Sequence, residues 1–395
     1  MKIIAVLEDV ITTGGAFNQS LNAIIRMSRI CQERFEFEVF STHAANINYL
    51  KQLGINCTLA NVSFKDRLLA ILVKSSLWPH IRSRIKFCGP FEKKINEHKG
   101  DLVYFLAQSQ SSEFLQDTNF ITTVFDLCHR DTPEFPEVRS FGEFRGREQH
   151  LKNNISQALI IITESDQLSA LISARYGIDR ERCLAMPLSS SPFLQAEFSV
   201  DKGLVMKKYE MTEGYFFYPG QFWSHKNHIR ILEALIQLRS SGVLHRVVFS
   251  GGDQGNRAHI ENFVSMHSLE DQVRFLGFVP ADDMRGLYEG SVAVIMPTYF
   301  GPTNIPPLEA WLTRKPLIYS AHLKEQAGDA AISVDPDDAL QLAEAMIECT
   351  KKEKAELLIE LGDLRLKSIA RQCESSEKEL LIRLARFEVR RRCWA

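Results

Sequence analysis

The chain has 395 residues, of which 45% are hydrophobic and 24% are charged, and this balance is typical of a globular protein. Its length fits about two domains, and its formal net charge of −2 gives no overall attraction to nucleic acid. Eight cysteines lie far apart without a CxxC pair, which argues against zinc ribbons and disulfide scaffolds. We therefore expect a cytoplasmic globular protein without a nucleic-acid partner.

The first apolar run, residues 3–7, reaches Glu8 and Asp9 after too few residues for the core of a signal peptide. No uninterrupted run in the sequence approaches the ~20 apolar residues that span a bilayer. Any membrane association is expected to be peripheral.

Short apolar runs alternate with helical stretches, which is the pattern of parallel sheets covered by helices on both faces. Strands of a first domain are predicted at residues 3–7, 37–41, 102–105, 121–125 and 158–163. Strands of a second are predicted at residues 215–218, 246–250, 273–276, 292–296 and 316–319. The pattern predicts an α/β protein with two Rossmann-like, doubly wound domains in tandem.

A Ser/Pro cluster at residues 187–192 marks a linker between these domains. The predicted organisation is an amino-terminal domain over 1–190, a linker over 191–214 and a carboxyl-terminal domain over 215–375. Helices are predicted at 339–347 and 353–366, and a final helix over 376–395 can pack back onto the first domain.

Ligands of open α/β sheets bind beyond the carboxyl ends of the strands, where loops and helix amino termini supply N–H donors. One such loop, residues 219–228, precedes a predicted helix and carries Lys226. A lysine there opposes the helix dipole, so a bound anion explains it better, and we predict a diphosphate ligand. His225 and His228 lack a nearby third metal ligand and are expected to make polar contacts at the start of the helix.

Gly14 and Gly15 follow the first strand, and adjacent glycines opening a helix let the backbone approach a diphosphate closely. The alternative is an ordinary turn between strand and helix. The loop over residues 297–311 has four prolines, one glycine and few charges, which favours a ligand site. Glu309 lies in the first turn of the helix that follows, where it could also serve the helix dipole.

Two long stretches carry a resemblance to a known family. The runs FSGGDQGN … VRFLGFVPADDMRGLYEGSVAVIMPTYFGPTNIPPLEAWLTRKPLI and YPGQFWSHKNHIRILEAL resemble the nucleotide-sugar half of the family-4 retaining glycosyltransferases. TVFDLCHRDTPEFPEV and ALIIITESDQLSALISARYGIDRERCLAMP look like segments of the acceptor domain of that family. The resemblance covers most of the chain in the right order. It implies the GT-B fold, in which two Rossmann-like domains face each other across a cleft.

The resemblance implies roles for particular residues. A lysine like Lys226 neutralises the donor diphosphate, assisted by amides like those of Gly14 and Gly15. A glutamate like Glu309 binds the ribose hydroxyls, and the backbone of residues 275–279, including Gly277 and Phe278, would frame the base. The sugar is transferred with retention of anomeric configuration, and the departing diphosphate can itself take the acceptor proton.

The chain departs from the family at two positions. Gly301 stands where the family usually has the first of two glutamates, and Gln221 stands where an arginine is frequent. Positioning of the donor sugar is then expected to fall to the backbone around Thr303, Asn304 and Ile305.

Many members place a histidine before an aspartate in the acceptor domain, and here the pair reads Phe125-Asp126. Asp126 is expected to hold a hydroxyl of the donor sugar or acceptor, with His129 substituting in part for the histidine. The alternative is that Asp126 caps a turn before Arg130. The carboxylates of residues 335–338 precede a helix that they are expected to cap, so no essential metal and no cofactor are predicted.

Residues 65–99 mix apolar and basic side chains, and residues 390–392 are three arginines. Such a surface can rest on anionic lipid, and the alternative is a solvated helix packed on the acceptor domain. In the related enzymes this region often faces a lipid-linked acceptor. The implied function is extension of a lipid-linked surface oligosaccharide, such as lipopolysaccharide O-antigen or capsule, at the inner face of a bacterial inner membrane.

The missing first carboxylate keeps a second function open, that of a non-catalytic protein of GT-B fold that binds a nucleotide sugar or serves as a scaffold. The nucleotide base, the donor sugar and the acceptor are not identified by the sequence.

Overall fold

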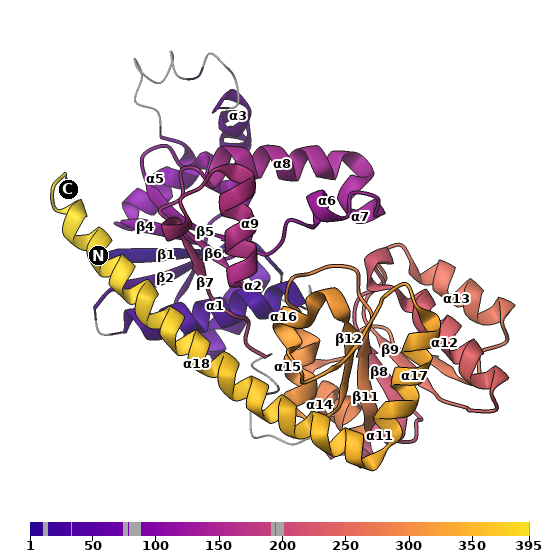
Figure 1. Cartoon of the computed structure of the whole chain (residues 1–395). Coiled ribbons are helices and arrows are strands. Elements are labelled where there is room, and N and C mark those ends of the chain that lie inside the picture. The colour runs from indigo at the N-terminus through magenta and orange to yellow at the C-terminus, as the bar shows by residue number, and fades with distance from the viewer. Residues whose placement is uncertain are drawn as a thin grey trace. The chain divides into compact units, whose positions relative to one another are not determined.

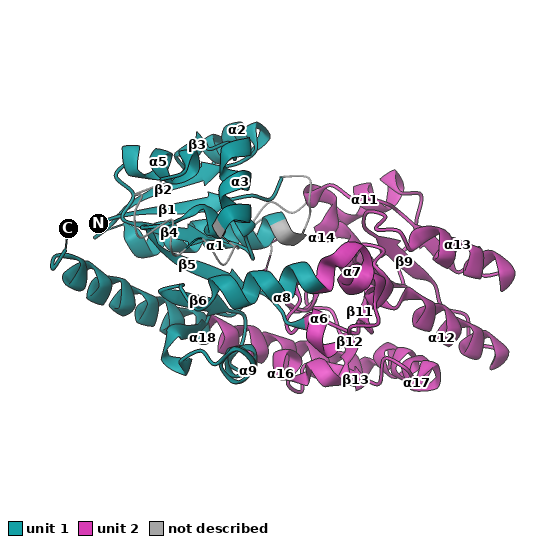
Figure 2. Cartoon of the chain, turned by 90° about the horizontal axis from the view of Figure 1, so that it is seen from above, with its two compact units in different colours: residues 1–127, 145–187, 372–395 teal, residues 128–144, 188–371 magenta. Residues whose placement is uncertain are grey.

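The computed structural model describes residues 1–10, 15–32, 34–73, 78, 88–190, 194 and 201–394. These residues form two compact units (Figures 1 and 2). Unit 1 comprises residues 1–127, 145–187 and 372–395, and unit 2 comprises residues 128–144 and 188–371. The chain therefore does not complete one unit before it enters the other.

The described part of unit 1 contains a seven-stranded parallel sheet in the order β3-β2-β1-β4-β5-β6-β7. Its strands are β1 (Lys2–Leu7), β2 (Glu36–Ser41), β3 (Cys57–Leu59), β4 (Leu102–Phe105), β5 (Asn119–Val124), β6 (Ile160–Thr163) and β7 (Cys183–Ala185). The strand order reverses between β1 and β4, which is where open α/β sheets place a ligand crevice. The short strands β3 and β7 were not predicted.

The helices of unit 1 include α1 (Gly15–Cys31), α2 (Ala44–Gln52), α3 (Phe64–Val73), α5 (Pro90–Glu97), α8 (Glu143–Asn154) and α9 (Asp166–Tyr176). Successive side chains of a strand point to opposite faces of a sheet, so β1 contributes to two cores. Ile3 and Leu7 pack on one face, and Ile4 and Val6 pack on the other, and all four are buried. This burial on both faces explains the unbroken apolar runs in the sequence.

The described part of unit 2 contains a six-stranded parallel sheet in the order β10-β9-β8-β11-β12-β13. Its strands are β8 (Tyr215–Pro219), β9 (Val247–Ser250), β10 (Val273–Phe275), β11 (Ser291–Met296), β12 (Leu317–Ser320) and β13 (Ile332–Val334). Its helices include α6 (Cys128–Asp131), α7 (Pro136–Arg139), α11 (Lys202–Lys208), α12 (His228–Ser240), α13 (Arg257–Met266), α14 (Ala281–Gly290), α15 (Ile305–Leu312), α16 (Lys324–Ala327) and α17 (Ala339–Thr350). The strand order reverses between β8 and β11, so the loops after these strands flank the expected crevice.

The last helix, α18 (Lys352–Arg391), is continuous over 40 residues, whereas two separate helices were predicted there. Its residues up to Arg371 belong to unit 2, and those from Gln372 onward belong to unit 1 (Figure 2). In unit 1, Arg391 pairs with Asp101 at 2.5 Å. The carboxyl-terminal part of α18 also adds apolar side chains to the core that contains Ile3, namely Leu380, Leu384 and Phe387.

Two predicted boundaries need correction. Residues 128–144 were placed in the amino-terminal domain, but they belong to unit 2 because Phe135 packs against Tyr299 and Phe300, with ring centroids 5.2 and 5.3 Å apart. Residues 191–193 and 195–200 of the predicted linker lie outside the described residues. The rest of that linker carries α11, which packs on α14 within unit 2 through Val205 and Gly286.

Among the described residues, no helix has both the length and the apolar character needed to cross a membrane.

Candidate functional site

Lys226 lies at the carboxyl edge of the sheet of unit 2, between β8 and α12. It ends a short 3₁₀ turn (Ser224–Lys226), and Tyr218 of β8 donates a hydrogen bond to its carbonyl at 2.8 Å. Asn227 follows in the left-handed conformation, and its side-chain amide donates to the carbonyls of Pro297 and Pro336 at 3.0 and 2.7 Å. The backbone on both sides of Lys226 is therefore held in place.

The amine of Lys226 is partly buried, and Nζ donates a hydrogen bond to Oδ1 of Asn304 at 3.2 Å. In the described part of the chain, no carboxylate lies within ion-pair distance of this amine. Burial lowers the pKa of Lys226 to about 8. The nearby Cys128 and Glu137 act in the opposite direction, but their effect on this pKa is smaller than that of burial. A cation without a carboxylate partner at the start of a helix is suited to bind an anion.

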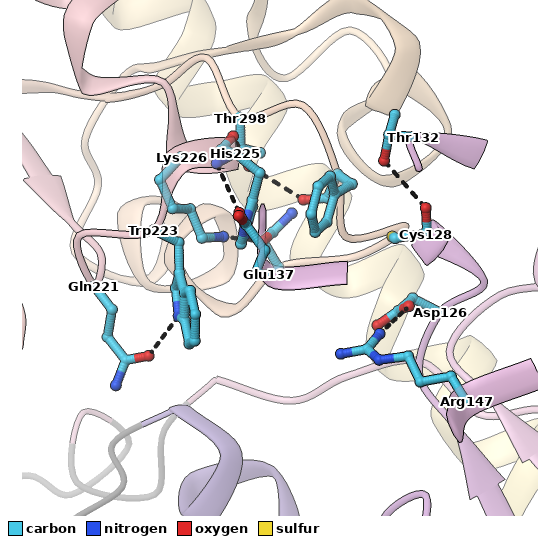
Figure 3. Close-up of polar contacts among 12 residues, drawn as sticks. Asp126, Cys128, Thr132, Glu137, Arg147, Gln221, Trp223, His225, Lys226 and Thr298 are labelled. Carbon is cyan, nitrogen blue, oxygen red and sulfur yellow. Dashed lines mark hydrogen bonds and ion pairs between the residues drawn. The ribbon is translucent and has the colours of Figure 1, made fainter. Parts of the chain in front are cut away.

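His225, the residue before the lysine, binds Glu137 of α7 (Figure 3). Glu137 accepts hydrogen bonds from the backbone N–H of His225 at 2.9 Å and from Nδ1 of its ring. Burial alone would raise the pKa of Glu137, but the hydrogen bonds from His225 outweigh it and hold the pKa below its usual range. The imidazole also stacks on Phe300, with centroids 3.8 Å apart. His225 therefore joins residues 128–144 to the loop after β11.

His228 does not make the polar contact that was expected at the start of the helix. Its ring is fully buried between Tyr218 and Phe222, with centroids 4.8 and 4.9 Å away, and neither ring nitrogen has a hydrogen-bond partner. Burial, with Lys226 and His225 nearby, lowers the pKa of His228 to about 3. The imidazole stays neutral and packs as an aromatic ring.

Glu309 is a buried residue of α15 and accepts a hydrogen bond from the hydroxyl of Tyr288 at 2.5 Å. Pro306 and Pro307 occupy the first turn of α15, where a missing N–H has no consequence. Glu309 follows them in the second turn of α15, not in the first turn as predicted. Its predicted contact with ribose hydroxyls stays a prediction.

The loop after β11 takes a backbone conformation at position 301 that favours glycine. Gly301 has a φ of +100°, and an added Cβ would lie 3.2 Å from Oδ1 of Asn304. A side chain at position 301 would therefore be strained by this backbone conformation and would press on the carboxamide of Asn304. The backbone N–H of Asn304, which was expected to help position the sugar, donates to Gln326 at 2.8 Å.

The other predicted residues of unit 2 lie at the same edge of the sheet, in loops or, for Ile305, at the first position of α15. Gln221 follows β8 and accepts a hydrogen bond from the indole of Trp223 at 3.0 Å (Figure 3). Gly277, with a φ of +68°, and the exposed Phe278 follow β10. Parallel strands end at one edge, so the sheet gathers the predicted residues of this half: Gln221, Lys226, Gly277, Phe278, Thr303, Asn304, Ile305 and Glu309.

The predicted residues of the other half divide between the units. Asp126 follows β5 in unit 1, where it pairs with Arg147 at 3.3 Å (Figure 3). His129 belongs to unit 2, is 1% exposed and contacts Phe144 edge-on at 5.5 Å. Gly14 lies outside the described residues, and Gly15 opens α1. The catalytic roles of Asp126 and His129 stay predictions.

Asp338 caps α17, as predicted, by accepting hydrogen bonds from Leu340 N and Gln341 N, both at 2.9 Å. Asp337 accepts a hydrogen bond from the hydroxyl of Tyr299 at 2.5 Å. No group of three or more His, Cys, Asp or Glu side chains is placed to hold a metal ion among the residues that the structure describes.

Sequence reasoning missed four side chains that shape this site: Glu137, Tyr288, Tyr319 and Gln326. Each is remote in sequence from the residue that it contacts, and no local pattern marks it.

Residues 213–352 match the family model described as "Glycosyl transferases group 1". This group 1 segment lies in unit 2 and contains Lys226, Asn304 and Glu309. It confirms, for this part of the chain, the resemblance predicted from the sequence.

Two relatives of similar sequence are named as O-antigen chain mannosyltransferases. The chain is 26% identical over 223 residues to the O-antigen chain mannosyltransferase B of Escherichia coli, covering 55% of this chain and 58% of that protein. It is 26% identical over 191 residues to the O-antigen chain mannosyltransferase RfbU of Salmonella typhimurium, covering 48% and 50%. The chain thus spans between half and three-fifths of the length of these relatives.

Solved structures match nearly the whole chain. Anabaena Alr3699/HepE in complex with UDP and glucose has a TM-score of 0.70 at 17% identity, covering 98% of this chain and 99% of that one. WaaG, a glycosyltransferase involved in lipopolysaccharide biosynthesis, has a TM-score of 0.64 at 13% identity, covering 96% and 98%. The predicted fold class is confirmed: the chain has the GT-B fold.

Proposed function

We propose that this chain is a glycosyltransferase that transfers a sugar from a nucleoside diphosphate sugar to a growing bacterial surface polysaccharide such as O-antigen. The group 1 segment, the O-antigen mannosyltransferase relatives and the GT-B fold support this proposal. A single observation carries it, namely the Lys226 ammonium at the start of α12, held by an amide and not neutralised by a carboxylate in the described part of the chain.

The proposed reaction retains the anomeric configuration. The bond between the anomeric carbon and the diphosphate oxygen breaks, and the acceptor oxygen bonds to the same face of that carbon. The departing diphosphate oxygen takes the proton of the acceptor hydroxyl. The protein's task is then to stabilise the charge that develops on the leaving group, which preorganised cations and helix termini do well. Lys226 would supply this charge, and Glu309 would hold the ribose.

We further propose that the reaction needs no metal ion and no organic cofactor, because the ammonium of Lys226 is placed to do the electrostatic work of a cation. A metal chelator should leave the initial rate unchanged. A rate that is lost with the chelator and restored by a divalent cation would contradict this part of the proposal.

The proposed activity is tested by incubating the purified chain with a panel of nucleoside diphosphate sugars. We expect one of them to stabilise the chain against heat, by about 2.7 kcal/mol at 100 times its Kd, and to be hydrolysed or transferred. Tight binding without turnover against any acceptor would instead support a non-catalytic sugar-nucleotide-binding protein. The observation that favours this second function is Gly301 in place of the family carboxylate.

We also propose that the acceptor is lipid-linked and that unit 1 contacts an anionic membrane surface through α3. Four apolar side chains of this helix are exposed at helical spacing: Phe64, Leu68, Ile71 and Leu72. Lys65 and Arg67 are exposed between them, so an apolar stripe lies beside positive charge. Within the predicted basic region of residues 65–99, residues 74–77 and 79–87 lie outside the described residues.

Flotation with liposomes tests the membrane contact. We expect the chain to float with anionic vesicles in low salt and to be released by high salt, since charge attraction is screened. The double variant Phe64→Ser/Ile71→Ser should lose flotation while keeping the melting temperature. Equal flotation with neutral vesicles, or none at all, would contradict the contact.

A further inference from the structure

The side chain of Asn304 lies between Lys226 and the interior of unit 2 and uses all its hydrogen-bonding groups at once. Its Oδ1 accepts from Lys226 Nζ at 3.2 Å. Its Nδ2 donates to the hydroxyl of Tyr319 at 2.7 Å and to the carbonyl of Gly301 at 3.1 Å. Asn304 is 8% exposed, so these bonds are shielded from water and favour one orientation of the carboxamide.

The backbone of Asn304 is held equally firmly. Gln326 of α16 accepts from the N–H of Asn304 at 2.8 Å and donates to its carbonyl at 2.6 Å. The Tyr319 hydroxyl also donates to Gln326 at 2.8 Å, and Arg365 donates to the Gln326 carbonyl at 2.7 Å. Residues of β12, α16 and α18 therefore hold Asn304 in one position. Because Asn304 accepts a hydrogen bond from Lys226 Nζ, it also limits the position of the lysine amine.

The neutrality of the amide has an electrostatic consequence. A carboxylate at this position would form a charge-assisted pair with the ammonium, raise the pKa of Lys226 and cancel much of its charge. The carboxamide instead holds the ammonium by one hydrogen bond and leaves the charge available to an anionic ligand. The other groups near the amine are Cys128 of α6, Glu137 of α7, and His225 and His228. Of these, only Glu137 is a carboxylate, and it is hydrogen-bonded to His225.

We propose that Asn304 is the positioning residue of Lys226: its carboxamide directs the ammonium toward the donor diphosphate and leaves that charge unneutralised. The residue at position 304 then sets both the affinity for diphosphate and the pH at which that affinity is lost. This inference rests on the proposed function, because it requires that Lys226 binds a diphosphate.

The test measures the Kd of a nucleoside diphosphate by calorimetry between pH 7 and pH 10, where the phosphates no longer titrate. UDP and GDP are the probes, and the better binder is used throughout. In the unchanged chain, affinity should fall as the pH rises past about 8, because Lys226 loses its proton. Lys226→Met should bind more weakly at pH 7 and lack this pH dependence.

Asn304→Asp keeps the size of the side chain and adds a charge. We expect about tenfold weaker binding at pH 7 and a fall in affinity displaced upward by about one pH unit. Asn304→Ala should also bind more weakly, with the fall displaced downward, because the ammonium loses a hydrogen-bond acceptor. Asn262→Asp, which adds the same charge at an exposed position of α13, is the matched control and should leave both quantities unchanged.

Tyr319→Phe gives a second, uncharged route if a variant at 304 does not fold. It removes the hydroxyl that accepts from Asn304 Nδ2, so affinity should drop severalfold while the pH of the fall stays near that of the unchanged chain. Failure of the unchanged chain to bind either nucleotide would count against the proposed function. The role of Asn304 would be overturned if Asn304→Asp bound with the affinity and pH dependence of the unchanged chain. If the variants at 304 do not fold, unchanged affinity in Tyr319→Phe would overturn it. Either result would leave the proposed function standing.

Discussion

At the scale of single residues, the site of unit 2 depends on how burial acts on neighbouring polar groups. Lys226 and His228 lie two positions apart, and burial lowers the pKa of both, to about 8 and about 3. Their outcomes differ because the lysine starts from a much higher pKa and keeps its proton at neutral pH. One residue is therefore available as a cation, and the other is a neutral ring in an aromatic core.

Replacing Lys226 tests its proposed catalytic role. Lys226→Met should lower kcat by roughly 10²–10³-fold, as expected for loss of a preorganised group that stabilises the leaving charge. The measurement is the steady-state rate of sugar transfer at saturating donor. Lys352→Met, an exposed lysine of the same unit, is the control and should keep the rate. A variant at 226 with an unchanged kcat would contradict the proposed mechanism.

The pair of Glu137 and His225 gives a prediction for stability. The pKa of Glu137 is depressed in the folded chain, so the pair contributes stability above the ordinary glutamate pKa of about 4.3 and loses it as the pH falls through the folded value. Glu137→Gln should lower the melting temperature at pH 7, and its difference from the unchanged chain should shrink at pH 3. Glu134→Gln, at an exposed position of the same segment, should cause no such pH-dependent difference.

At the scale of elements, packing overrides local propensity in α18. Gly362 lies inside this 40-residue helix, where glycine costs about 1 kcal/mol relative to alanine. A Cβ at this position would lie 2.6 Å from Cδ1 of Trp311, so the glycine allows the helix to approach α15 closely. The indole of Trp311 donates to the carbonyl of Ala330 at 2.9 Å, which limits its movement. The contact explains why a poor helix former stands here.

Two glycine substitutions should therefore have opposite effects. Gly362→Ala should lower the free energy of unfolding by about 1–3 kcal/mol through overpacking against Trp311. Gly146→Ala, in α8 with nothing within 4 Å of the added Cβ, should raise it by about 0.5–1 kcal/mol. Denaturant titration of both variants measures these differences. Stabilisation by both substitutions would show that the close approach at Gly362 has no energetic weight.

At the scale of the whole molecule, the chain does not divide at one linker. Unit 1 is completed by residues 372–395, and unit 2 includes residues 128–144, so each unit depends on segments distant in sequence. The core of unit 1 around Ile3 includes Leu380, Leu384 and Phe387 of α18. Burial of such side chains stabilises a protein by about 1.5–3 kcal/mol each.

Truncation tests this dependence. A chain ending at Arg371 should have a destabilised unit 1, seen in limited proteolysis as early cleavage within residues 1–127, while the group 1 segment persists. A chain that lacks only residues 393–395 should resist proteolysis like the full chain. Equal resistance of the two truncated chains would contradict the structural role of α18 in unit 1.

Much of the fold could be predicted from local sequence. Apolar β-branched runs between helical stretches predict parallel strands because such strands are buried on both faces. Three edge strands were missed, Cys57–Leu59, Cys183–Ala185 and Ile332–Val334, and each has only three residues, which gives a weak periodic signal. The equally short strand Val273–Phe275 was predicted. The tandem Rossmann-like pattern was confirmed. The assignment of residues 128–144 to unit 2 and of residues 372–395 to unit 1 was not predicted, because it depends on contacts between residues far apart in the sequence.

The sequence by itself determined the α/β class, the order of the elements and the presence of a lysine where a helix begins, because these follow from the periodicity and chemistry of neighbouring residues. Only the tertiary structure decided that Asn304 holds the lysine amine, that Gln326 and Tyr319 hold Asn304, and that Glu137 holds His225. Each of these contacts joins residues on different elements. Their partners are selected by how the elements pack, and a local sequence pattern does not contain that information.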